Sequence, residues 1–357
     1  MSFIDKAKTV RKGEELDVSR IEEFLKGTIP GLSGTLSVRQ FPSGYSNLTY
    51  LLTIGDREWI LRRPPFGKKA RTAHDMGREY RILKALSPVF PYCPKPLAYT
   101  EDTSIIGSTF YVMERLRGII LRKDLPPDLS FTPEEARQLC QKLLDVQMQL
   151  HAIDYKKIGL ENYGKPKGYV ERQVVGWSDR YRAARTDDAP DCEKVMAWIH
   201  ENMPPDCDRP GIVHNDYRFD NVVLDEQNPM KIIGILDWEM ATIGDPLMDL
   251  GNSLAYWVQR DDPPEMHLMR VTPTNMEGAL TRKEIIRQYS EKSGRLIENF
   301  DFYYCFGLFR LAVIAQQIYY RYYHGQTKDE RFKMLIHGVR VLDKTARRVI
   351  KGSTSPG

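Results

Sequence analysis

The sequence predicts an α+β fold, with a β-rich N-terminal lobe in residues 1–116 and a mainly helical C-terminal lobe in residues 117–357. Two observations carry this prediction. Runs rich in apolar and β-branched residues lie close together near the start, at 35–40, 48–54 and 58–62. Further along, apolar residues recur at helical spacing and helix-capping signals multiply. A chain of 357 residues is long enough for two such lobes.

Helix starts are marked at several places. Ser19 and Thr281 each begin a capping box, with a Glu three residues later. Thr132 with Pro133 gives an N-cap and a proline at the first helical position. The aromatic stretch 302–323 has helical spacing, so we expect its side chains to form core or, for some of them, the floor of an acceptor pocket.

Composition limits the function classes. The hydrophobic fraction of 41% and the charged fraction of 28% are typical of a globular protein. A net charge of +4 gives no argument for a nucleic-acid partner. The five cysteines lack CxxC pairing, which favours a reducing compartment over a disulfide framework. No apolar leader or run of ~20 apolar residues occurs, so we expect a cytoplasmic protein without a membrane partner.

One constellation of polar residues predicts phosphoryl transfer. A hydroxyl can be phosphorylated when a carboxylate accepts its proton and metal ions neutralise the phosphate charge. Asp216, Asn221 and Asp237 can supply this base and these ligands. The apolar runs 222–224 and 231–236 would pair as antiparallel strands, so we expect Asp237 beside Asn221. Their oxygens suit Mg²⁺.

A structural reading of the same residues is also open. Asp and Asn are common in turns, so Asp216 and Asn221 could merely cap a turn between strands. The ordered set of three groups, with two strands behind it, favours a nucleotide-dependent phosphotransferase. A zinc site is not favoured, because no second His or Cys lies at ligand spacing.

The motifs in this region resemble those of a known family. His214, Asp216 and Asn221 match the pattern His-x-Asp-x-x-x-x-Asn, and Asp237 lies in an Ile-x-Asp-Trp segment. The run 244–250 is similar to the segment that follows. The chain thereby resembles the aminoglycoside phosphotransferase and choline kinase family, which has a protein-kinase-like two-lobed fold. It looks most like the subgroup related to the kinase-like domain of some acyl-CoA dehydrogenases.

The resemblance implies a role for each residue. Asp216 would be the catalytic base, Asn221 and Asp237 the Mg²⁺ ligands, and His214 a loop-stabilising residue. ATP or GTP would be the phosphate donor. The N-terminal lobe would bind the nucleotide, and the C-terminal lobe would carry the catalytic loop and the acceptor-binding region.

Three further polar residues are expected to be structural. Asp245 precedes Pro246 as an N-cap, and Asp249 lies one turn into the same predicted helix. We expect both acids to support the catalytic loop more than to bind metal. His151 ends a predicted core helix, which favours a packed or capping role over catalysis.

The turn between the first two β-like runs is a candidate phosphate-binding loop. It contains Ser43, Gly44, Ser46 and Asn47, and it resembles the family's Gly-x-Ser-Asn segment. Backbone N–H groups and small hydroxyls in such a loop can bind phosphate. An ordinary hairpin turn has the same composition and is the alternative.

The cation expected near the phosphates is Arg62, where protein kinases place a lysine. Arginine can fork to phosphate and to a carboxylate at once. We expect that carboxylate to be Glu79, on a helix spanning 72–86. The alternative is a solvated Glu79 that makes only contacts along its own helix.

The resemblance also implies an adenine site at the end of the strand 109–114. Glu114 and Leu116 would contact the base there, mainly through backbone groups. A plain exit from a core strand is the alternative.

The acceptor is constrained by charge. Residues 252–357 contain 17 Lys and Arg against 11 Asp and Glu, whereas a polycationic aminoglycoside would require an acidic cleft. A neutral or anionic alcohol fits better, and the subgroup resemblance implies a hydroxyacyl-CoA or similar small alcohol. Three alternatives stay open: an aminoglycoside-type antibiotic kinase, a nucleotide-binding pseudokinase without transfer activity, and a metal-dependent phosphohydrolase.

Overall fold

The computed structural model describes residues 6–42, 47–66 and 75–353. Its contacts divide the chain into two compact units. The first unit comprises Met1–Ile120, Ile158–Leu160 and Asn221–Ala241. The second unit comprises Leu121–Lys157, Glu161–Asp220 and Thr242–Gly357. The candidate base Asp216 therefore belongs to the second unit, whereas the candidate metal ligands belong to the first.

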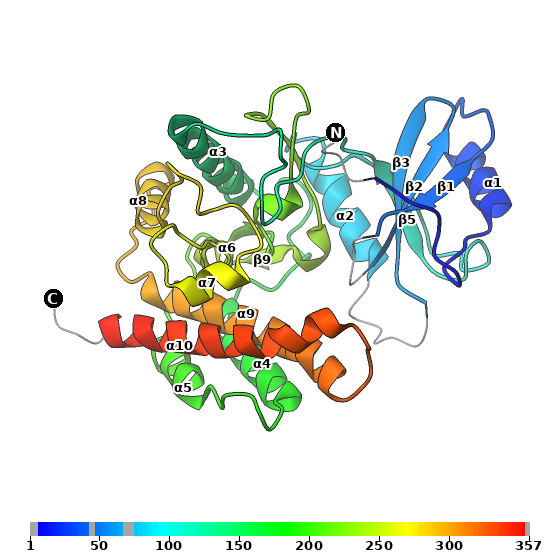
Figure 1. Cartoon of the computed structure of the whole chain (residues 1–357). Coiled ribbons are helices and arrows are strands. Elements are labelled where there is room, and N and C mark those ends of the chain that lie inside the picture. The colour runs from blue at the N-terminus through cyan, green and yellow to red at the C-terminus, as the bar shows by residue number, and fades with distance from the viewer. Residues whose placement is uncertain (1–5, 43–46, 67–74, 354–357) are drawn as a thin grey trace. The chain divides into compact units, whose positions relative to one another are not determined.

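The first unit is built on a five-stranded antiparallel sheet with the order β1-β2-β3-β5-β4 (Figure 1). The strands are β1 (Ser37–Gln40), β2 (Leu48–Ile54), β3 (Arg57–Arg63), β4 (Pro96–Thr100) and β5 (Phe110–Glu114). Gly55, with a φ of 57°, makes the tight turn between β2 and β3. The expected early strands are therefore confirmed.

The two faces of β3 have different partners. Leu61 lies in an apolar cluster with Ile21 and Leu25 of α1 (Val18–Thr28). Because side chains alternate along a strand, Arg62 points to the opposite face. There it meets Glu79 of α2 (Met76–Leu86). Strand periodicity thus places a cation toward a helix that carries a carboxylate.

The start of α1 differs from the expectation. Asp17, not Ser19, is the N-cap, and its side chain accepts a hydrogen bond from the backbone N–H of Arg20 at 3.1 Å. The predicted capping box at Ser19 is therefore wrong. An aspartate two residues earlier already satisfies one of the first free N–H groups, so the helix begins there.

The first unit also holds a hairpin of β7 (Val222–Leu224) and β8 (Ile232–Ile235). Val222 pairs with Ile235 in antiparallel register. The short 3₁₀ helix η2 (Trp238–Met240) follows β8. This hairpin confirms the predicted return of the chain from one apolar run to the next.

The second unit is mainly helical. Its helices are α3 (Pro133–Ala152), α4 (Tyr169–Ala184), α5 (Glu193–Glu201), α6 (Pro246–Ala255), α7 (Pro264–Met269), α8 (Arg282–Ser293), α9 (Asp301–Tyr323) and α10 (Leu335–Ser353). Strands β6 (Gly211–Val213) and β9 (Thr242–Gly244) pair antiparallel. The 3₁₀ helix η3 (Glu330–Met334) also lies in this unit, whereas η1 (Phe219–Asn221) begins in it and ends at Asn221 of the first unit. The predicted N-cap at Thr132 and the predicted capping box at Thr281 are confirmed, and Thr132 also forms a capping box with Glu135.

Helix α9 organises the second unit. It packs against α4, α5, α6 and α10, and Figure 1 shows it running alongside α10. Its predicted aromatic stripe is largely buried, with Phe302, Phe306 and Phe309 among the most buried side chains. A Cβ on Gly307 would lie 2.3 Å from the backbone oxygen of Gly251, so the two glycines let α9 and α6 approach closely.

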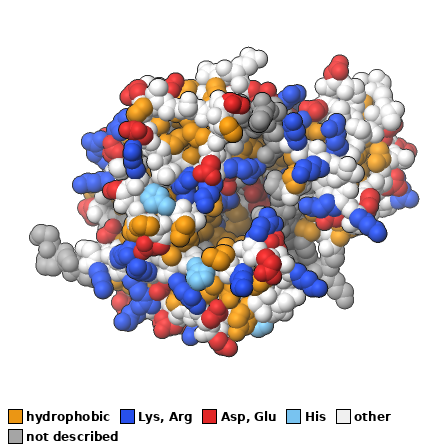
Figure 2. All heavy atoms as spheres, viewed as in Figure 1, with side chains coloured by type: hydrophobic (Ala, Val, Ile, Leu, Met, Phe, Trp, Pro, Cys, Tyr) orange, Lys and Arg blue, Asp and Glu red, His pale blue; other side chains and the backbone are white. Residues whose placement is uncertain are grey.

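Charged side chains of both signs lie on the surface of the protein (Figure 2). Figure 2 shows Lys and Arg side chains interspersed with Asp and Glu on the visible face. Among the described residues, no helix combines the length and the apolar character that crossing a bilayer requires.

Candidate active site

The loop that carries Asp216 runs from β6 to η1 in the second unit. Its first residue, His214, is fully buried, and its Nδ1 accepts the backbone N–H of Asp216 at 3.3 Å. Asn215 has a φ of 65°, which reverses the chain between these two residues. Tyr169 of α4 donates to the side-chain oxygen of Asn215 at 3.3 Å. His214 and Tyr169 thus hold the backbone of Asp216 and the side chain of the residue before it.

Asp249 of α6 is the main anchor of this loop. Its carboxylate accepts the backbone N–H groups of His214 and Asn215 at 3.2 and 2.5 Å. Its Oδ2 also lies 2.9 Å from Nε2 of His151, whose Nδ1 lies 2.9 Å from the hydroxyl of Tyr289. Burial raises the pKa of Asp249, but the hydrogen bond and charge of His151 outweigh this and hold the pKa below its usual range. The expected structural roles of Asp249 and His151 agree with these contacts.

Asp216 itself remains partly accessible and lies beside a cation. Nε of Arg218 is 3.4 Å from Oδ1 of Asp216 and 2.9 Å from Oδ1 of Asp220. The closer pair is not aligned as a hydrogen bond, so the attraction is electrostatic. Burial raises the pKa of Asp220 to about 6, although Arg218 opposes that shift. The Arg218 guanidinium also lies 4.4 Å from the ring centroid of Tyr256.

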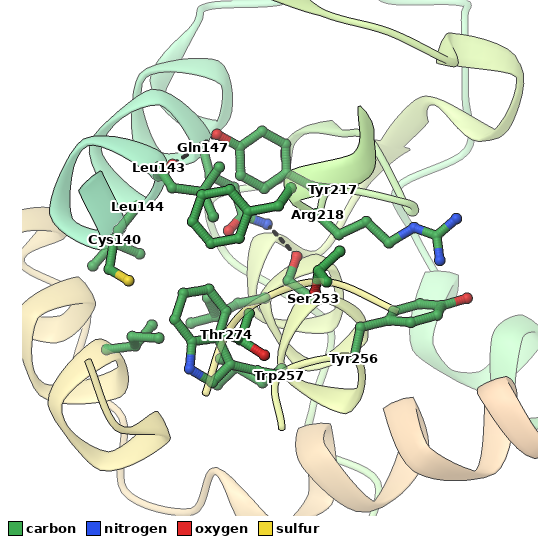
Figure 3. A pocket seen from close by; sticks show the side chains of 15 residues that line it. Cys140, Leu143, Leu144, Gln147, Tyr217, Arg218, Ser253, Tyr256, Trp257 and Thr274 are labelled. Atoms are coloured by element: carbon green, nitrogen blue, oxygen red, sulfur yellow. Dashed lines mark hydrogen bonds between the residues drawn. The ribbon is translucent and has the colours of Figure 1, made fainter. Parts of the chain in front are cut away.

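A small cavity lies behind the loop in the second unit (Figure 3). Its volume of about 20 Å³ holds no more than a water molecule. Gln147 donates to Ser253 at 3.0 Å, and the hydroxyl of Tyr217 donates to the backbone oxygen of Leu143 at 2.7 Å. Figure 3 shows Arg218 and Tyr256 extending together away from this apolar cluster. The side chains around the cavity therefore support the loop, and the cavity itself is too small to hold an acceptor.

In the first unit, the β7–β8 hairpin brings the two candidate metal ligands together. The backbone N–H of Leu236 donates to the backbone oxygen of Asn221 at 2.8 Å. Asp237 follows directly, with a φ of 67° that turns its side chain out of the strand. Its side chain is 37% exposed, so the carboxylate can still accept a ligand.

Arg62 lies between this hairpin and α2. Its Nη1 donates to Oε1 of Glu79, and its Nη2 lies 3.1 Å from Oδ1 of Asp237 and 3.5 Å from Oε2 of Glu239. Burial lowers the pKa of Arg62, but the surrounding carboxylates raise it well above its usual value. The expected ion pair of Arg62 with Glu79 is present. The alternative, a solvated Glu79, is wrong, because this side chain is only 2% exposed.

This arrangement fits a divalent cation. Glu79, Asp237 and Glu239 surround one guanidinium, so the described groups within ion-pair distance carry more negative than positive charge. Mg²⁺ typically takes one or two carboxylates and completes its shell with phosphate oxygens and water. Asn221 and Asp237 offer oxygens of this kind. In the described ranges no three His, Cys, Asp or Glu side chains form a metal-binding group.

The remaining residues predicted to bind the nucleotide belong to the candidate phosphate-binding loop and to the end of β5. Asn47 is buried, and its Nδ2 donates to Oε2 of Glu239 at 2.7 Å. Oε1 of Glu114 accepts the backbone N–H of Lys95 at 2.8 Å. Leu116 packs on Gly234, where a Cβ would lie 2.1 Å from its Cδ1. Ser43, Gly44 and Ser46 lie outside the described residues.

Sequence reasoning missed three residues of this region. Glu239 contacts both Arg62 and Asn47. Arg218 lies beside the candidate base, and the Tyr256 ring lies against Arg218. Glu239 and Arg218 stand inside the two motif segments, so their charge beside Asp237 and Asp216 was the available signal. Tyr256 had no local signal, because it is brought to the loop by the C-terminal end of α6.

Comparison with solved structures defines the class of the fold. A putative aminoglycoside phosphotransferase from Ralstonia eutropha is 30% identical and superposes with a TM-score of 0.81, covering 95% of this chain and 99% of that one. Choline kinase from Cryptosporidium parvum is 13% identical, with a TM-score of 0.63 over 94% of this chain and 96% of that one. The chain has the α+β, protein-kinase-like fold that its sequence predicts.

The family follows from the sequence itself. Residues 37–272 match the sequence model of the Phosphotransferase enzyme family, and the chain belongs to that family. By its description, this is a family of phosphotransferases. The chain is also similar to acyl-CoA dehydrogenase family member 11, at 32% identity for the Homo sapiens protein over 96% of this chain and 34% for the Gallus gallus protein over 90%. It spans only 44% and 42% of the length of these two relatives.

Proposed function

We propose that the chain is a Mg²⁺-dependent small-molecule kinase that moves the γ-phosphate of ATP or GTP to an alcohol. The observation that carries the proposal is the anchored loop around Asp216. Asp249 accepts two consecutive backbone N–H groups just before Asp216, which fixes the backbone that presents this carboxylate. A catalytic base must hold its geometry in this way.

In the proposed reaction, Asp216 accepts the proton of the acceptor hydroxyl. The acceptor oxygen forms a bond to the γ-phosphorus, the bond from that phosphorus to the bridging oxygen breaks, and the nucleoside diphosphate leaves. Arg218 lies beside Asp216 and keeps its carboxylate oriented. These steps balance in atoms and charge without a further reactant.

The nucleotide side of the proposal rests on the first unit. Asn221 and Asp237 would hold Mg²⁺, which when bound offsets the charge of the phosphates. Arg62, steered by Glu79, would contact phosphate oxygens, together with Ser43, Gly44, Ser46 and Asn47 of the loop. Glu114 and Leu116 would lie at the base. A thermostable mutant of the aminoglycoside phosphotransferase APH(4)-Ia is 16% identical to this chain, with a TM-score of 0.58. Its solved structure is a complex with AMP-PNP and hygromycin B, which supports a nucleotide as the phosphate donor here.

The acceptor is proposed to be a neutral or anionic alcohol, such as a hydroxyacyl-CoA. The similarity to acyl-CoA dehydrogenase family member 11 supports a substrate related to acyl metabolism. An aminoglycoside remains the second candidate, because the Ralstonia eutropha relative is described as a putative aminoglycoside phosphotransferase.

The test compares Asp216→Asn, Asp237→Ala and the wild type. Asp216→Asn is expected to keep nucleotide binding and to lower transfer at least about 1,000-fold, because general base catalysis and charge alignment are lost. Asp237→Ala is expected to weaken binding of the Mg²⁺-nucleotide itself. Asp208→Asn is the matched control, since this acid is 84% exposed in the same unit as Asp216.

Three outcomes would contradict the proposal. Full transfer activity in Asp216→Asn would remove this residue as the base. Nucleotide binding without turnover across alcohols, amino sugars and hydroxyacyl thioesters would support a pseudokinase. Release of phosphate from monoesters without any nucleotide would support a phosphohydrolase.

A further inference from the structure

Arg310 of α9 is a buried cation with no carboxylate of the described residues at ion-pair distance. It is only 4% exposed, and its contact within the described chain is with the ring of Trp177, whose centroid lies 5.0 Å from its guanidinium carbon. The buried arginines of the first unit differ, since Arg62 pairs with Glu79 and Arg63 donates to the backbone oxygen of Ile106 at 3.0 Å. A buried charge without a partner is costly, so such a residue calls for a functional reason.

The Arg310 guanidinium is not sealed in the core. Several described polar atoms are fully enclosed and lack a hydrogen-bond partner, and the guanidinium nitrogens of Arg310 do not belong to that set. The side chain is thus buried along its length, while its charged end reaches accessible space. A small anion can approach such an end and form a forked pair of hydrogen bonds with it.

The surroundings of Arg310 connect it with the catalytic loop inside the second unit. Burial raises the pKa of Tyr256, and the charges of Arg218 and Arg310 lower it, while that of Asp216 raises it. Tyr256 therefore lies within electrostatic reach of both arginines and of the candidate base. Figure 3 shows Tyr256 and Arg218 extending in the same direction. Tyr169, which bonds to Asn215, also feels the charge of Arg310.

We propose that Arg310 binds an anionic group of the acceptor, a carboxylate or a phosphate, while Asp216 faces its hydroxyl. The proposal rests on the function proposed above and narrows the acceptor to an anionic alcohol. The guanidinium carbon of Arg310 lies 5.0 Å from the centroid of the Trp177 ring, and that of Arg218 lies 4.4 Å from the centroid of the Tyr256 ring. An anionic group bound by Arg310 would orient the acceptor relative to Asp216.

Binding is tested first, without turnover. Inorganic phosphate and butyrate are titrated separately into the full chain while tryptophan fluorescence is recorded, because Trp177 lies against the proposed site. Trp177→Phe identifies the part of the signal that belongs to this ring. Arg310→Gln is compared with Arg180→Gln, whose exposed guanidinium lies 4.8 Å from the centroid of the same ring.

The expected result is a saturable response to at least one anion that is about 10- to 100-fold weaker in Arg310→Gln and unchanged in Arg180→Gln. Response to phosphate alone identifies a phosphate-bearing acceptor, and response to butyrate alone a carboxylate-bearing one. No saturable response, or an equal response in Arg310→Gln, overturns the proposal. The Tm of Arg310→Gln without anion is expected at or above that of the wild type, whereas a large drop would indicate a structural arginine.

Turnover then separates this proposal from the kinase function. Matched acceptors are 4-hydroxybutyrate with butane-1,4-diol, and glycerol 3-phosphate with glycerol. The anionic member of at least one pair is expected to have a kcat/KM at least about tenfold higher, and Arg310→Gln is expected to remove that preference mainly through KM. Preference for the neutral members overturns the anion site and leaves the kinase function intact. Anion binding that depends on Arg310, with no alcohol phosphorylated, supports the site and counts against the kinase function.

Discussion

Arg62 of β3 and Glu79 of α2 form an ion pair that is buried on both sides, with side chains 9% and 2% exposed. The second terminal nitrogen of Arg62 lies 3.1 Å from a carboxylate oxygen of Asp237, at the end of the β7–β8 hairpin. One planar guanidinium thus joins a sheet, a helix and a hairpin of the first unit. A lysine ammonium presents a single point of charge and cannot reproduce this fork.

The first prediction concerns this pair. In a double-mutant cycle of Arg62→Gln and Glu79→Gln, we expect a coupling energy of about 1–3 kcal/mol in nucleotide affinity, because each residue fixes the other. Arg62→Lys is expected to restore only part of the affinity. Nucleotide binding is measured by calorimetry, with circular dichroism to check folding.

The matched control for this cycle is the exposed pair of Arg117 and Glu226, 3.1 Å apart in the same unit. Its coupling in nucleotide affinity should be close to zero, and its coupling in stability below about 1 kcal/mol. Purely additive effects at Arg62 and Glu79 would show that Glu79 does not steer the arginine.

The second prediction concerns Asp249. Replacement by Asn removes the charge that binds two loop N–H groups and His151, so Asp249→Asn is expected to lose about 2–4 kcal/mol of unfolding free energy at pH 7. Transfer activity should fall as well, since the backbone before Asp216 is no longer fixed. Urea unfolding at a series of pH values measures the stability.

The pH dependence has a definite sign. The folded-state pKa of Asp249 lies below the ordinary value of 3.8. Its contribution is therefore fully present above that value and is lost as the pH falls through the lower folded-state pKa. The stability difference between wild type and Asp249→Asn should be constant near neutral pH and shrink below about pH 4. A difference that does not change with pH would contradict an ionised Asp249. Asp179→Asn, at a side chain 70% exposed, is the control.

The third prediction concerns the contact of α6 with α9. In Gly307→Ala the new Cβ would lie 2.3 Å from the backbone oxygen of Gly251, so the helices must separate. We expect a loss of about 1–3 kcal/mol in unfolding free energy, because overpacking of this size forces backbone shifts. Gly27→Ala in α1 is the control, since its Cβ would meet nothing within 4 Å. That variant should be neutral or slightly more stable. Equal effects of the two substitutions would contradict the close approach.

Much of the fold was accessible from the sequence because its signals are local. The N-cap at Thr132 and the capping box at Thr281 depend on residues a few positions apart, and the structure has both. The ion pair of Arg62 with Glu79 was also within reach, since strand alternation and helical spacing each restrict where those side chains point. The contact geometry follows from such rules, whereas its role in nucleotide binding stays a prediction.

Other features depend on contacts that no local pattern encodes. Asn47 and Glu239 are 192 residues apart in the chain and meet through a side-chain hydrogen bond. Arg310 lies in an aromatic stripe whose spacing predicts a core helix, and only the packing of α9 against α4 shows that its guanidinium lies 5.0 Å from the centroid of the Trp177 ring. The capping-box pattern at Ser19 predicted the wrong helix start, because Asp17 is an equally good N-cap and lies two residues earlier.

Asn215 and Asp237 both have a left-handed backbone conformation. In the described part of the chain, three residues other than glycine have a positive φ, and these are two of them, at 65° and 67°. Asn and Asp tolerate this conformation better than other side chains, yet glycine would hold it at lower cost. The side chains at these two positions also make contacts that glycine would lose, because Tyr169 donates to Asn215 at 3.3 Å and Nη2 of Arg62 lies 3.1 Å from Asp237. Glycine at either position would relieve the backbone strain and remove the contact together, so the stability of such a variant reports the sum of two opposing effects.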